Sequence, residues 1–262
     1  MNLFKIFGSI LKINLLNELQ YKTQVYMCLV NLALDVFLSI VIVMLMFSQT
    51  TRINTWKKED VLILIGIYRI INGLLYLFIK PSLTSFTQSI KSGDFDYVLL
   101  LPIDAQFSSG IKEINIWKMV DVIFGVLFIL VLKNIFRIDF NLINILMSIL
   151  ALIIGFMIIA SLYFIIASFS FWVLDSSNLL IIFPQCLEWT GKWPISVFPK
   201  FFRLLFTYII PVGVAVTVPA EALLNKLELK TLGVSLLLCI GLMVVSRIIW
   251  RLGIKKYTGA SS

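Results

Sequence analysis

The 262-residue chain has no histidine, and only 14% of its residues are charged. Histidine is the commonest metal ligand and general acid–base group, so its absence removes the usual centre of many enzymes. Soluble domains carry roughly 25% charged residues. Because 60% of the residues are hydrophobic and the mean hydropathy is +1.00, the composition excludes a soluble globular protein, a disordered chain and a secreted disulfide scaffold.

Cysteine is also scarce: Cys28, Cys186 and Cys239 stand far apart and match no CxxC or zinc-ligand spacing. No GxxxxGK[ST] loop is present, so we expect no ATP bound in that way and no cofactor in this chain. We likewise expect no metal site. The net charge of +8 indicates basic loops that face anionic lipid, rather than a nucleic-acid partner.

Long apolar runs predict an all-α polytopic membrane protein with one transmembrane domain over residues 1–262. A helix rises about 1.5 Å per residue, so runs of this length cross a hydrocarbon core of ~30 Å. The boundary between the fourth and fifth spans, near Ser168 to Ser176, is the least defined. The six expected spans are residues 25–47, 61–79, 114–132, 142–170, 173–189 and 232–250.

Residues 1–22 are too short and too interrupted to cross. Apolar residues recur there at helical spacing, with polar residues on another face, which predicts an amphipathic helix in the membrane interface. A cleaved signal peptide is disfavoured because Lys12 and Asn14 interrupt the apolar region and no small-residue cleavage site follows.

Between spans five and six, residues 191–230 are apolar in part yet rich in proline. Proline inside a helix removes a hydrogen bond at a cost of about 3 kcal/mol in water, although kinked spanning helices tolerate it. We expect a re-entrant helical hairpin here, with a seventh span as the alternative. The residues assigned to this hairpin are Pro194, Pro199, Pro211, Pro219 and Glu221.

Three charged residues lie well inside predicted spans, seven or more residues from the ends: Asp35, Arg69 and Asp121. Asp35 and Arg69 each lie ~15 Å from the same surface and Asp121 ~10 Å from it, at about 1.5 Å per residue. We therefore expect an Asp35–Arg69 ion pair, with Asp121 as the alternative partner. The pair either fixes helix register or lines a substrate path, and reversing both charges should restore the folded yield that one reversal loses.

The longest hydrophilic stretch, residues 80–112, contains the run SGDFDYVLLLPI from Ser92 to Ile103. We expect a short helix over 84–91, ended by Gly93. Asp94 and Asp96 alone make a poor metal site, and Asp96 is predicted to cap the helix that follows.

At this stretch the chain resembles the ABC-2 type permeases, in particular the paired six-span branch that includes viologen-type exporters. That branch carries S-G-E-L-D-x-L-L-x-x-P-L, of which Ser92, Gly93, Asp96, Leu99, Leu100 and Pro102 match. The run from Trp193 to Pro199, the prolines that follow it and the tail from Gly253 are also similar to the family's pattern. The family often has arginine where Tyr97 and Leu101 stand.

The resemblance implies a coupling helix between spans two and three, docked in a cleft of a separate ABC ATPase. Two ATPase copies would bind ATP and Mg and serve two permease subunits, the second being a related, non-identical chain or this chain itself. It also implies a cytoplasmic membrane location with both termini cytosolic and with membrane lipid around the spans. The residues assigned to coupling are Thr84, Phe86, Gly93, Phe95, Asp96, Tyr97, Leu99 and Pro102, with Phe86, Phe95 and Tyr97 as apolar anchors.

On this basis we expect the permease subunit of an exporter for an amphipathic or hydrophobic substrate, such as a drug-like cation, a peptide or a lipid, with no catalytic residues of its own. Two alternatives stay open. An energy-independent carrier or channel would place intramembrane charges on several helices around one midplane site. A lipid-modifying membrane enzyme would need a metal cluster or a nucleophile that the sequence does not show.

Overall fold

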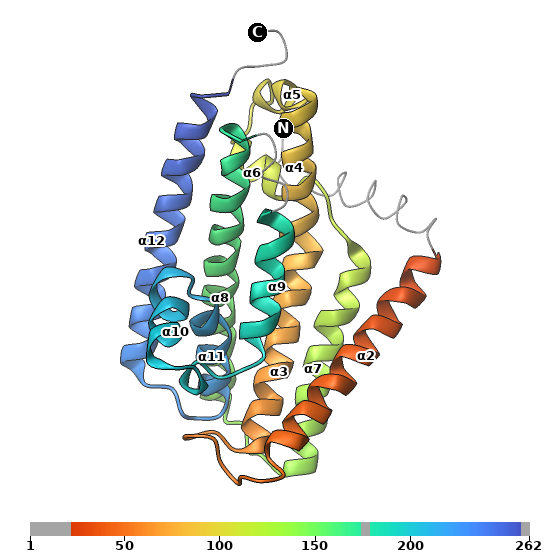
Figure 1. Cartoon of the computed structure of the whole chain (residues 1–262), viewed down its shortest axis with the longest axis vertical. Coiled ribbons are helices and arrows are strands. Elements are labelled where there is room, and N and C mark those ends of the chain that lie inside the picture. Colours follow the sequence, from red (N-terminus) through yellow and green to blue (C-terminus); the bar gives the residue numbers. More distant parts are fainter. Residues whose placement is uncertain (1–21, 174–178, 258–262) are drawn as a thin grey trace.

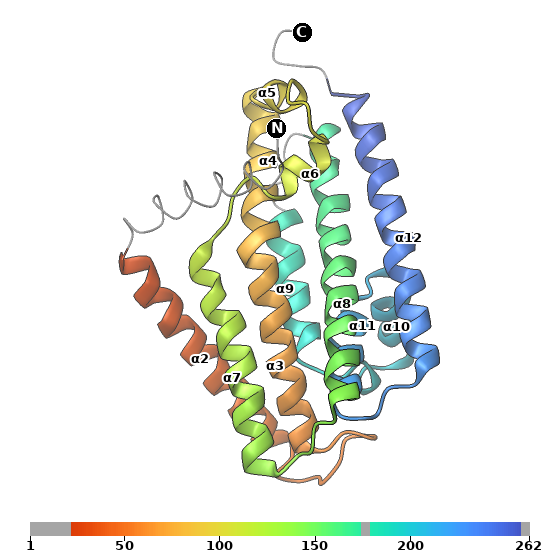
Figure 2. The same ribbon diagram turned by 180° about the vertical axis from the view of Figure 1, so that it is seen from behind.

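A computed structural model describes residues 22–173 and 179–257, with side chains from residue 26 onward. This part of the chain is helical and contains no strand, apart from an isolated bridge between Ile53 and Trp56. Figure 1 and Figure 2 show the helices side by side in one elongated bundle. In chain order they are α2 (Lys22–Met46), α3 (Lys58–Leu74), η1 (Leu75–Ile79), α4 (Lys80–Ser92), α5 (Phe95–Leu99), α6 (Ala105–Gly110), η2 (Ile116–Lys118), α7 (Met119–Phe136), α8 (Leu142–Ser168), η3 (Phe169–Phe171), α9 (Leu179–Gly191), η5 (Ile195–Val197), α10 (Lys200–Leu204), η6 (Leu205–Ile209), α11 (Val212–Leu223) and α12 (Leu229–Ile254).

Five segments of the described chain are long and apolar enough to cross a membrane, and a bent helix pair would make a sixth. The chain is therefore a multi-pass helical membrane protein. The predicted spans 25–47, 61–79, 114–132, 142–170 and 232–250 each fall on one of these segments. The segments are Tyr26–Met46, Lys58–Ser92, Ile116–Phe136, Leu142–Phe171 and Leu229–Ile254.

The predicted fifth span, residues 173–189, corresponds to α9. This helix has 13 residues, or about 20 Å at 1.5 Å per residue, which is less than the ~30 Å of a hydrocarbon core. Residues 174–178 lie outside the description, so the span stays a prediction. The predicted interface helix over 1–22 also lies outside it, except for its last residue.

The second span is much longer than predicted. α3, η1 and α4 form one continuous helical segment of 35 residues, Lys58–Ser92, about 52 Å long at 1.5 Å per residue. It therefore extends well beyond a hydrocarbon core and has a π-helical turn at η1. Gly93 ends it with φ 84°, a left-handed conformation that glycine adopts without a Cβ clash.

This extension carries α5 to one end of the bundle, near the C-terminal end of α12 (Figure 1). We call this the α5 end. α10 and α11 lie toward the opposite end, beside α8 and α12 in both views, and we call this the α10 end. The spans therefore separate a loop of short helices at one end from a proline-rich segment toward the other.

The predicted hairpin appears as a bent pair, Lys200–Ile209 and Val212–Leu223, with 90° between its helices. Its shape fits either a re-entrant hairpin or one broken span. Three prolines of the segment stand directly before a helical turn, where the missing N–H is not needed. They are Pro194 before η5, Pro199 before α10 and Pro211 before α11. Of the prolines in residues 191–230, only Pro219 lies inside a helix, in the buried α11.

Small residues allow the central helices to approach closely. A Cβ on Gly125 of α7 would come within 2.9 Å of the Gly66 carbonyl oxygen on α3, and one on Gly155 of α8 within 2.2 Å of the Ala215 carbonyl oxygen on α11. Without a hydrophobic force between lipid-solvated helices, such backbone approach is a main source of helix association in membranes. α3 with α7 and α8 with α11 are thus the most closely packed helix pairs of the described bundle.

Candidate functional site

The three predicted intramembrane charges meet inside the bundle. The Arg69 guanidinium on α3 forms an ion pair with Asp35 on α2, and its Nη1 lies 3.7 Å from Asp121 Oδ1 on α7. The Arg69 side chain is only 8% exposed and that of Asp121 only 5%. One arginine therefore joins three spans through two carboxylates.

Three further charged residues complete this charged cluster, and the sequence interpretation missed them. Lys192 Nζ donates to Asp35 Oδ1 at 2.6 Å and lies 3.4 Å from Glu188 Oε1; Lys118 Nζ lies 3.1 Å from Asp121 Oδ2. Each acid therefore faces a cation, as charges in a low-dielectric interior require. The i,i+3 spacing of Lys118 and Asp121 and the i,i+4 spacing of Glu188 and Lys192 could have revealed both pairs.

The charged cluster lines two cavities that share Asp35 and Glu188. The first, of about 270 Å³, also contacts Arg69, Lys118 and Asp121. The second, of about 510 Å³, has a more apolar wall of α2 and α3 residues and is also lined by Lys192, Trp189 and Trp193. Cavities with mostly apolar walls and a few convergent polar groups are the usual form of small-molecule sites.

The predicted coupling segment divides into a buried part and an exposed part. Phe86 and Phe95 are 1% and 0% exposed. They pack against each other and against Phe171 and Trp250, with ring centroids 4.6–6.3 Å apart. Both rings are therefore covered by their own chain and present no surface to a partner in this arrangement, and their assignment to ATPase coupling stays a prediction. They fix the loop onto η3, which follows α8, and onto α12.

The exposed part is a short apolar tip made by α5 and the residues after it. Tyr97 is 71% exposed, Leu99 41%, Leu100 80% and Leu101 47%. Thr84 and Pro102 are exposed as well. The tip lies at the α5 end of the bundle (Figures 1 and 2), where the long α3–α4 helix ends.

The acidic residues of the loop behave differently from the prediction. Asp96 does not cap α5, because it lies within the first turn of that helix. Asp94 stands at the cap position and makes no cap hydrogen bond; its carboxylate instead accepts from Ser92 Oγ at 2.6 Å. Burial and a hydrogen bond with Asp96 raise the pKa of Tyr257, whose hydroxyl thus stays protonated and donates to the Gly93 carbonyl oxygen at 3.4 Å.

A second tie joins the loop to α12. Arg247 forms an ion pair with Asp104, and its Nη1 donates to Gln106 Oε1 at 2.9 Å. Asp104 also caps α6 by accepting from the Phe107 N–H at 3.0 Å. The hydrogen bond from Arg247 and the backbone bonds lower the pKa of Asp104, so the pair is charged at neutral pH.

The proline-rich segment is tied to the loop between α2 and α3 and to the first turn of α3. Asn54 Nδ2 donates to the Ser196 carbonyl oxygen at 2.8 Å, and Lys226 forms an ion pair with Asp60. Glu221 is partly buried on α11. These bonds hold the α10 end together. The charged cluster lies between this end and the α5 end.

Among the described residues, no group of three or more histidine, cysteine or acidic side chains is arranged to hold a metal ion.

Comparison with known proteins adds one finding: the sequence model of a family described as ABC-2 family transporter protein matches residues 33–261. This match includes the charged cluster, the loop at the α5 end and the bent pair. Among curated proteins, none matches the chain.

Proposed function

The chain belongs to the ABC-2 family of transporter proteins, and we propose that it is the membrane-spanning permease subunit of an ATP-driven exporter. Permeases of this family lack an ATPase domain, and membership implies an ABC ATPase as partner. The proposed substrate is amphipathic or hydrophobic: a drug-like cation, a peptide or a lipid. ATP and Mg would be bound by the ATPase and not by this chain.

The observation that carries this proposal is the exposed apolar tip around Tyr97 and Leu100 on an otherwise well-packed loop. Burying four exposed apolar side chains in a partner's cleft is favourable at roughly 25 cal/mol per Å². The tip stands on the rings of Phe86 and Phe95, which are held in the core. A partner that displaces the tip would therefore displace the helices beneath it.

The continuous helix Lys58–Ser92 provides the mechanical connection. It runs from the α10 end to the loop and carries Arg69 of the charged cluster on the way. When the ATPase pair closes on ATP, a movement of the tip would shift Arg69 relative to Asp35 on α2 and Asp121 on α7. Such a rigid-body shift between two discrete arrangements is a recurrent form of allosteric coupling.

The two cavities at the charged cluster are the proposed start of the substrate path. Their acids and bases neutralise each other in this arrangement, so an entering polar group would have to exchange with a pair already formed. We propose that two permease subunits and two ATPase copies form the complex, the second permease being a related chain or a second copy of this one. We further propose that both termini and the tip are cytosolic and that the bent pair shapes the outer exit.

The test is assembly with ABC ATPase candidates in nanodiscs, with bound ATPase and ATP hydrolysis both measured. We would substitute Leu100→Asp, which charges the tip without touching the aromatic cluster. The matched control is Leu229→Asp, because Leu229 is 74% exposed at the α10 end. Leu100→Asp should abolish ATPase binding and Leu229→Asp should leave it unchanged.

Deletion of residues 84–102 is the poorer experiment, because it would remove Phe86 and Phe95 from the core and unfold the loop. The proposal is overturned if the intact chain recruits no ABC ATPase, or if Leu100→Asp binds it as well as the unchanged chain. Substrate flux through the chain alone, without ATP, would favour a carrier or channel instead.

A further inference from the structure

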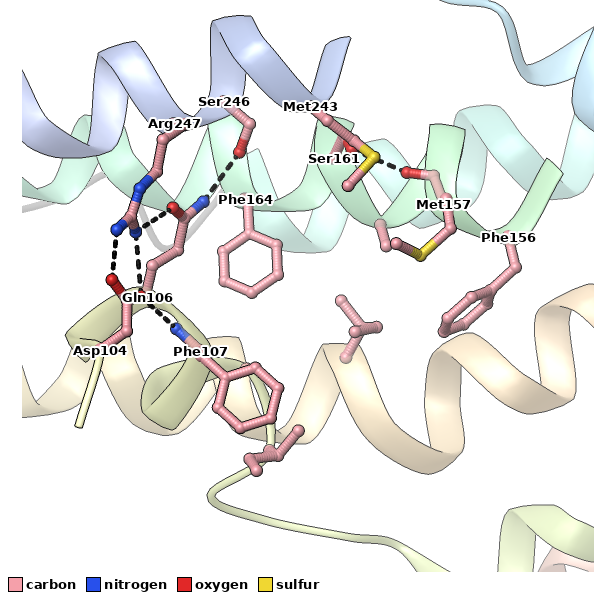
Figure 3. Close-up of a pocket in the computed structure, with 14 residues that line it drawn as sticks. Asp104, Gln106, Phe107, Phe156, Met157, Ser161, Phe164, Met243, Ser246 and Arg247 are labelled. Carbon is pink, nitrogen blue, oxygen red and sulfur yellow. Dashed lines mark hydrogen bonds and ion pairs between the residues drawn. The ribbon is translucent and has the colours of Figure 1, made fainter. Parts of the chain in front are cut away.

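An apolar pocket of about 500 Å³ lies between α8 and α12, on the side of α6 (Figure 3). Its walls include Phe156, Met157 and Phe164 from α8, Met243 from α12 and Phe107 from α6. The Ser161 hydroxyl in the wall donates to the Met157 carbonyl oxygen at 2.7 Å, so it offers no free donor. The interior therefore suits a hydrocarbon chain rather than a sugar or a peptide backbone, whose polar groups would find no partners there.

One end of the pocket is polar and preorganised. Arg247 is held there by Asp104 and by Gln106, and Gln106 Nε2 in turn donates to Ser246 Oγ at 3.0 Å (Figure 3). A guanidinium has five N–H donors, and the three bonds to Asp104 and Gln106 leave donors free. Arg251 lies one turn further along α12, on the same face and exposed.

The entrance faces the surface of the described bundle. Met243 is 43% exposed and Phe107 is 54% exposed. Arg247 is seven residues from Ile254, the end of α12, so it lies roughly 10 Å inside that end at 1.5 Å per residue. At this depth an arginine can reach the headgroup region while its apolar surroundings remain in hydrocarbon.

We propose that this pocket binds an anionic phospholipid, with one acyl chain between α8 and α12 and the phosphate at Arg247 and Arg251. The positive charge around the polar end of the pocket favours an anionic headgroup. Asp104 already neutralises Arg247, so the additional positive charge comes from Arg251 and from Lys255 and Lys256 at the same end of α12. A zwitterionic headgroup would gain much less from these charges.

The site is separate from the proposed substrate path. Its lining residues include none of those that line the two cavities of the charged cluster. It joins α12 to α6 in the loop at the α5 end, so the bound lipid would hold the loop against the membrane-spanning helices. The inference requires a membrane protein but no ATPase, so it can fail or hold independently of the exporter proposal.

The experiment is native mass spectrometry of the full chain in detergent, titrated with phosphatidylglycerol or phosphatidylcholine of identical acyl chains. Ala160→Phe fills the pocket from α8, where Ala160 is 6% exposed and lines it. Ile153→Phe is the matched control, since Ile153 lies on the same helix and is 60% exposed. Arg251→Gln tests the headgroup and leaves the Asp104–Arg247 pair intact.

The unchanged chain and Ile153→Phe should retain one phosphatidylglycerol molecule at activation energies that strip phosphatidylcholine, and Ala160→Phe should lose it. Arg251→Gln should weaken phosphatidylglycerol binding about fivefold, as expected for one basic residue near an anionic lipid. If Ala160→Phe does not fold, Met243→Trp narrows the pocket from the α12 side and should give the same loss.

Equal retention of both lipids by the unchanged chain would overturn the proposal. So would an unaltered phosphatidylglycerol stoichiometry in a folded pocket-filling variant. A change in the ratio of monomer to dimer without a change in bound lipid would assign the pocket to an interface between copies of this chain, and would equally overturn it.

Discussion

Arg69 shows how a single buried charge can be supported by several partners. Its guanidinium is near both Asp35 and Asp121, and these acids also face Lys192 and Lys118. The sequence placed Asp35, Arg69 and Asp121 at similar depths, and the structure brings all three together. The sequence alone did not show that Lys192 joins them, because no spacing indicates that the end of α9, directly before this lysine, lies at the depth of Asp35.

Arg69→Gln should lower the stability of the folded chain by less than the about 3–5 kcal/mol that breaking a buried ion pair usually costs, because Asp35 keeps Lys192 and Asp121 keeps Lys118. Asp35→Asn should cost less, since the Asp35 side chain is 27% exposed and Arg69 keeps Asp121. Thermal unfolding in detergent measures both, and the double variant should be less destabilised than the sum of the two. Strict additivity would show that the two residues do not interact.

Exchanging the two charges should not restore full stability, contrary to the expectation from sequence. An arginine at position 35 would face Lys192, and an aspartate at position 69 would face Asp121, so two like-charged contacts would replace two opposite ones. Full recovery of folded yield by the exchanged variant would show that position 35 does not contact Lys192 and that position 69 does not contact Asp121 in the folded chain.

Asp104 makes the stability of the folded chain depend on pH. Its pKa is lowered from the ordinary value of 3.8, chiefly by the hydrogen bond from Arg247. A group with a lowered folded pKa stabilises the folded state above its ordinary pKa, and this contribution is lost as the pH falls below 3.8 toward the folded value. Because both partners are more than a third exposed, the effect is at most ~1 kcal/mol.

Asp104→Asn should therefore remove the part of the acid-induced loss of stability that lies below pH 3.8, while it keeps the α6 cap that asparagine also provides. Asp104→Ala should lose both the charge and the cap, and be the less stable of the two at neutral pH. Melting temperatures measured between pH 3 and pH 7 distinguish them. Identical pH profiles for the unchanged chain and Asp104→Asn would contradict this assignment.

At the scale of elements, the main difference from the sequence prediction is that the second spanning helix continues into α4. The sequence predicts a span over 61–79 and a separate short helix over 84–91, and the structure joins them through η1. Pro81 does not interrupt the segment, because it occupies the second position of α4 next to the π-helical turn. The apolar tip thus follows directly on the end of a spanning helix, separated from it only by the turn at Gly93.

Close packing of α8 on α11 makes a testable element-scale prediction. Gly155→Ala should destabilise the chain by about 1–3 kcal/mol, because the added Cβ would meet the Ala215 carbonyl oxygen at 2.2 Å and backbone would have to move. Gly241→Ala is the control: its Cβ meets nothing within 4 Å, so it should be neutral or stabilise by up to about 1 kcal/mol. Equal melting temperatures for the two variants would mean that α11 is not held against α8.

At the scale of the whole molecule, the described chain has two different ends. The α5 end carries the exposed apolar tip and the basic end of α12, whereas the α10 end carries the bent pair and its ties to the loop before α3. Lysine and arginine are spread almost evenly over the loops, so the positive-inside rule does not by itself assign these ends to sides of a membrane. The orientation rests on the proposed function.

This orientation predicts the labelling of introduced cysteines. In a chain with Cys28, Cys186 and Cys239 replaced, an impermeant maleimide applied to intact cells should label Leu229→Cys at the α10 end and not Lys256→Cys at the α5 end. Both positions are exposed, so both should react after permeabilisation, which is the control. Labelling of Lys256→Cys alone in intact cells would reverse the proposed topology.

The sequence by itself determined the class of this protein, most of its spans and the position of its intramembrane charges. These features follow from local quantities: the length of an apolar run, the spacing of prolines and the depth of a residue along a helix. Phe86 and Phe95 mark the limit of such reasoning, since aromatic residues in a hydrophilic stretch have the same sequence appearance whether they face a partner or their own core.

Only the tertiary structure decided which aromatic rings are buried, that α4 continues α3, that Lys192 reaches Asp35, and that a pocket forms between α8 and α12. Each depends on side chains from segments far apart in the sequence: Phe95 contacts Trp250, and Asp104 contacts Arg247. Burial is a property of the packed helices together, because a side chain loses contact with its surroundings only when another element covers it. No local pattern contains that information, which is why the functional surface had to be found in three dimensions.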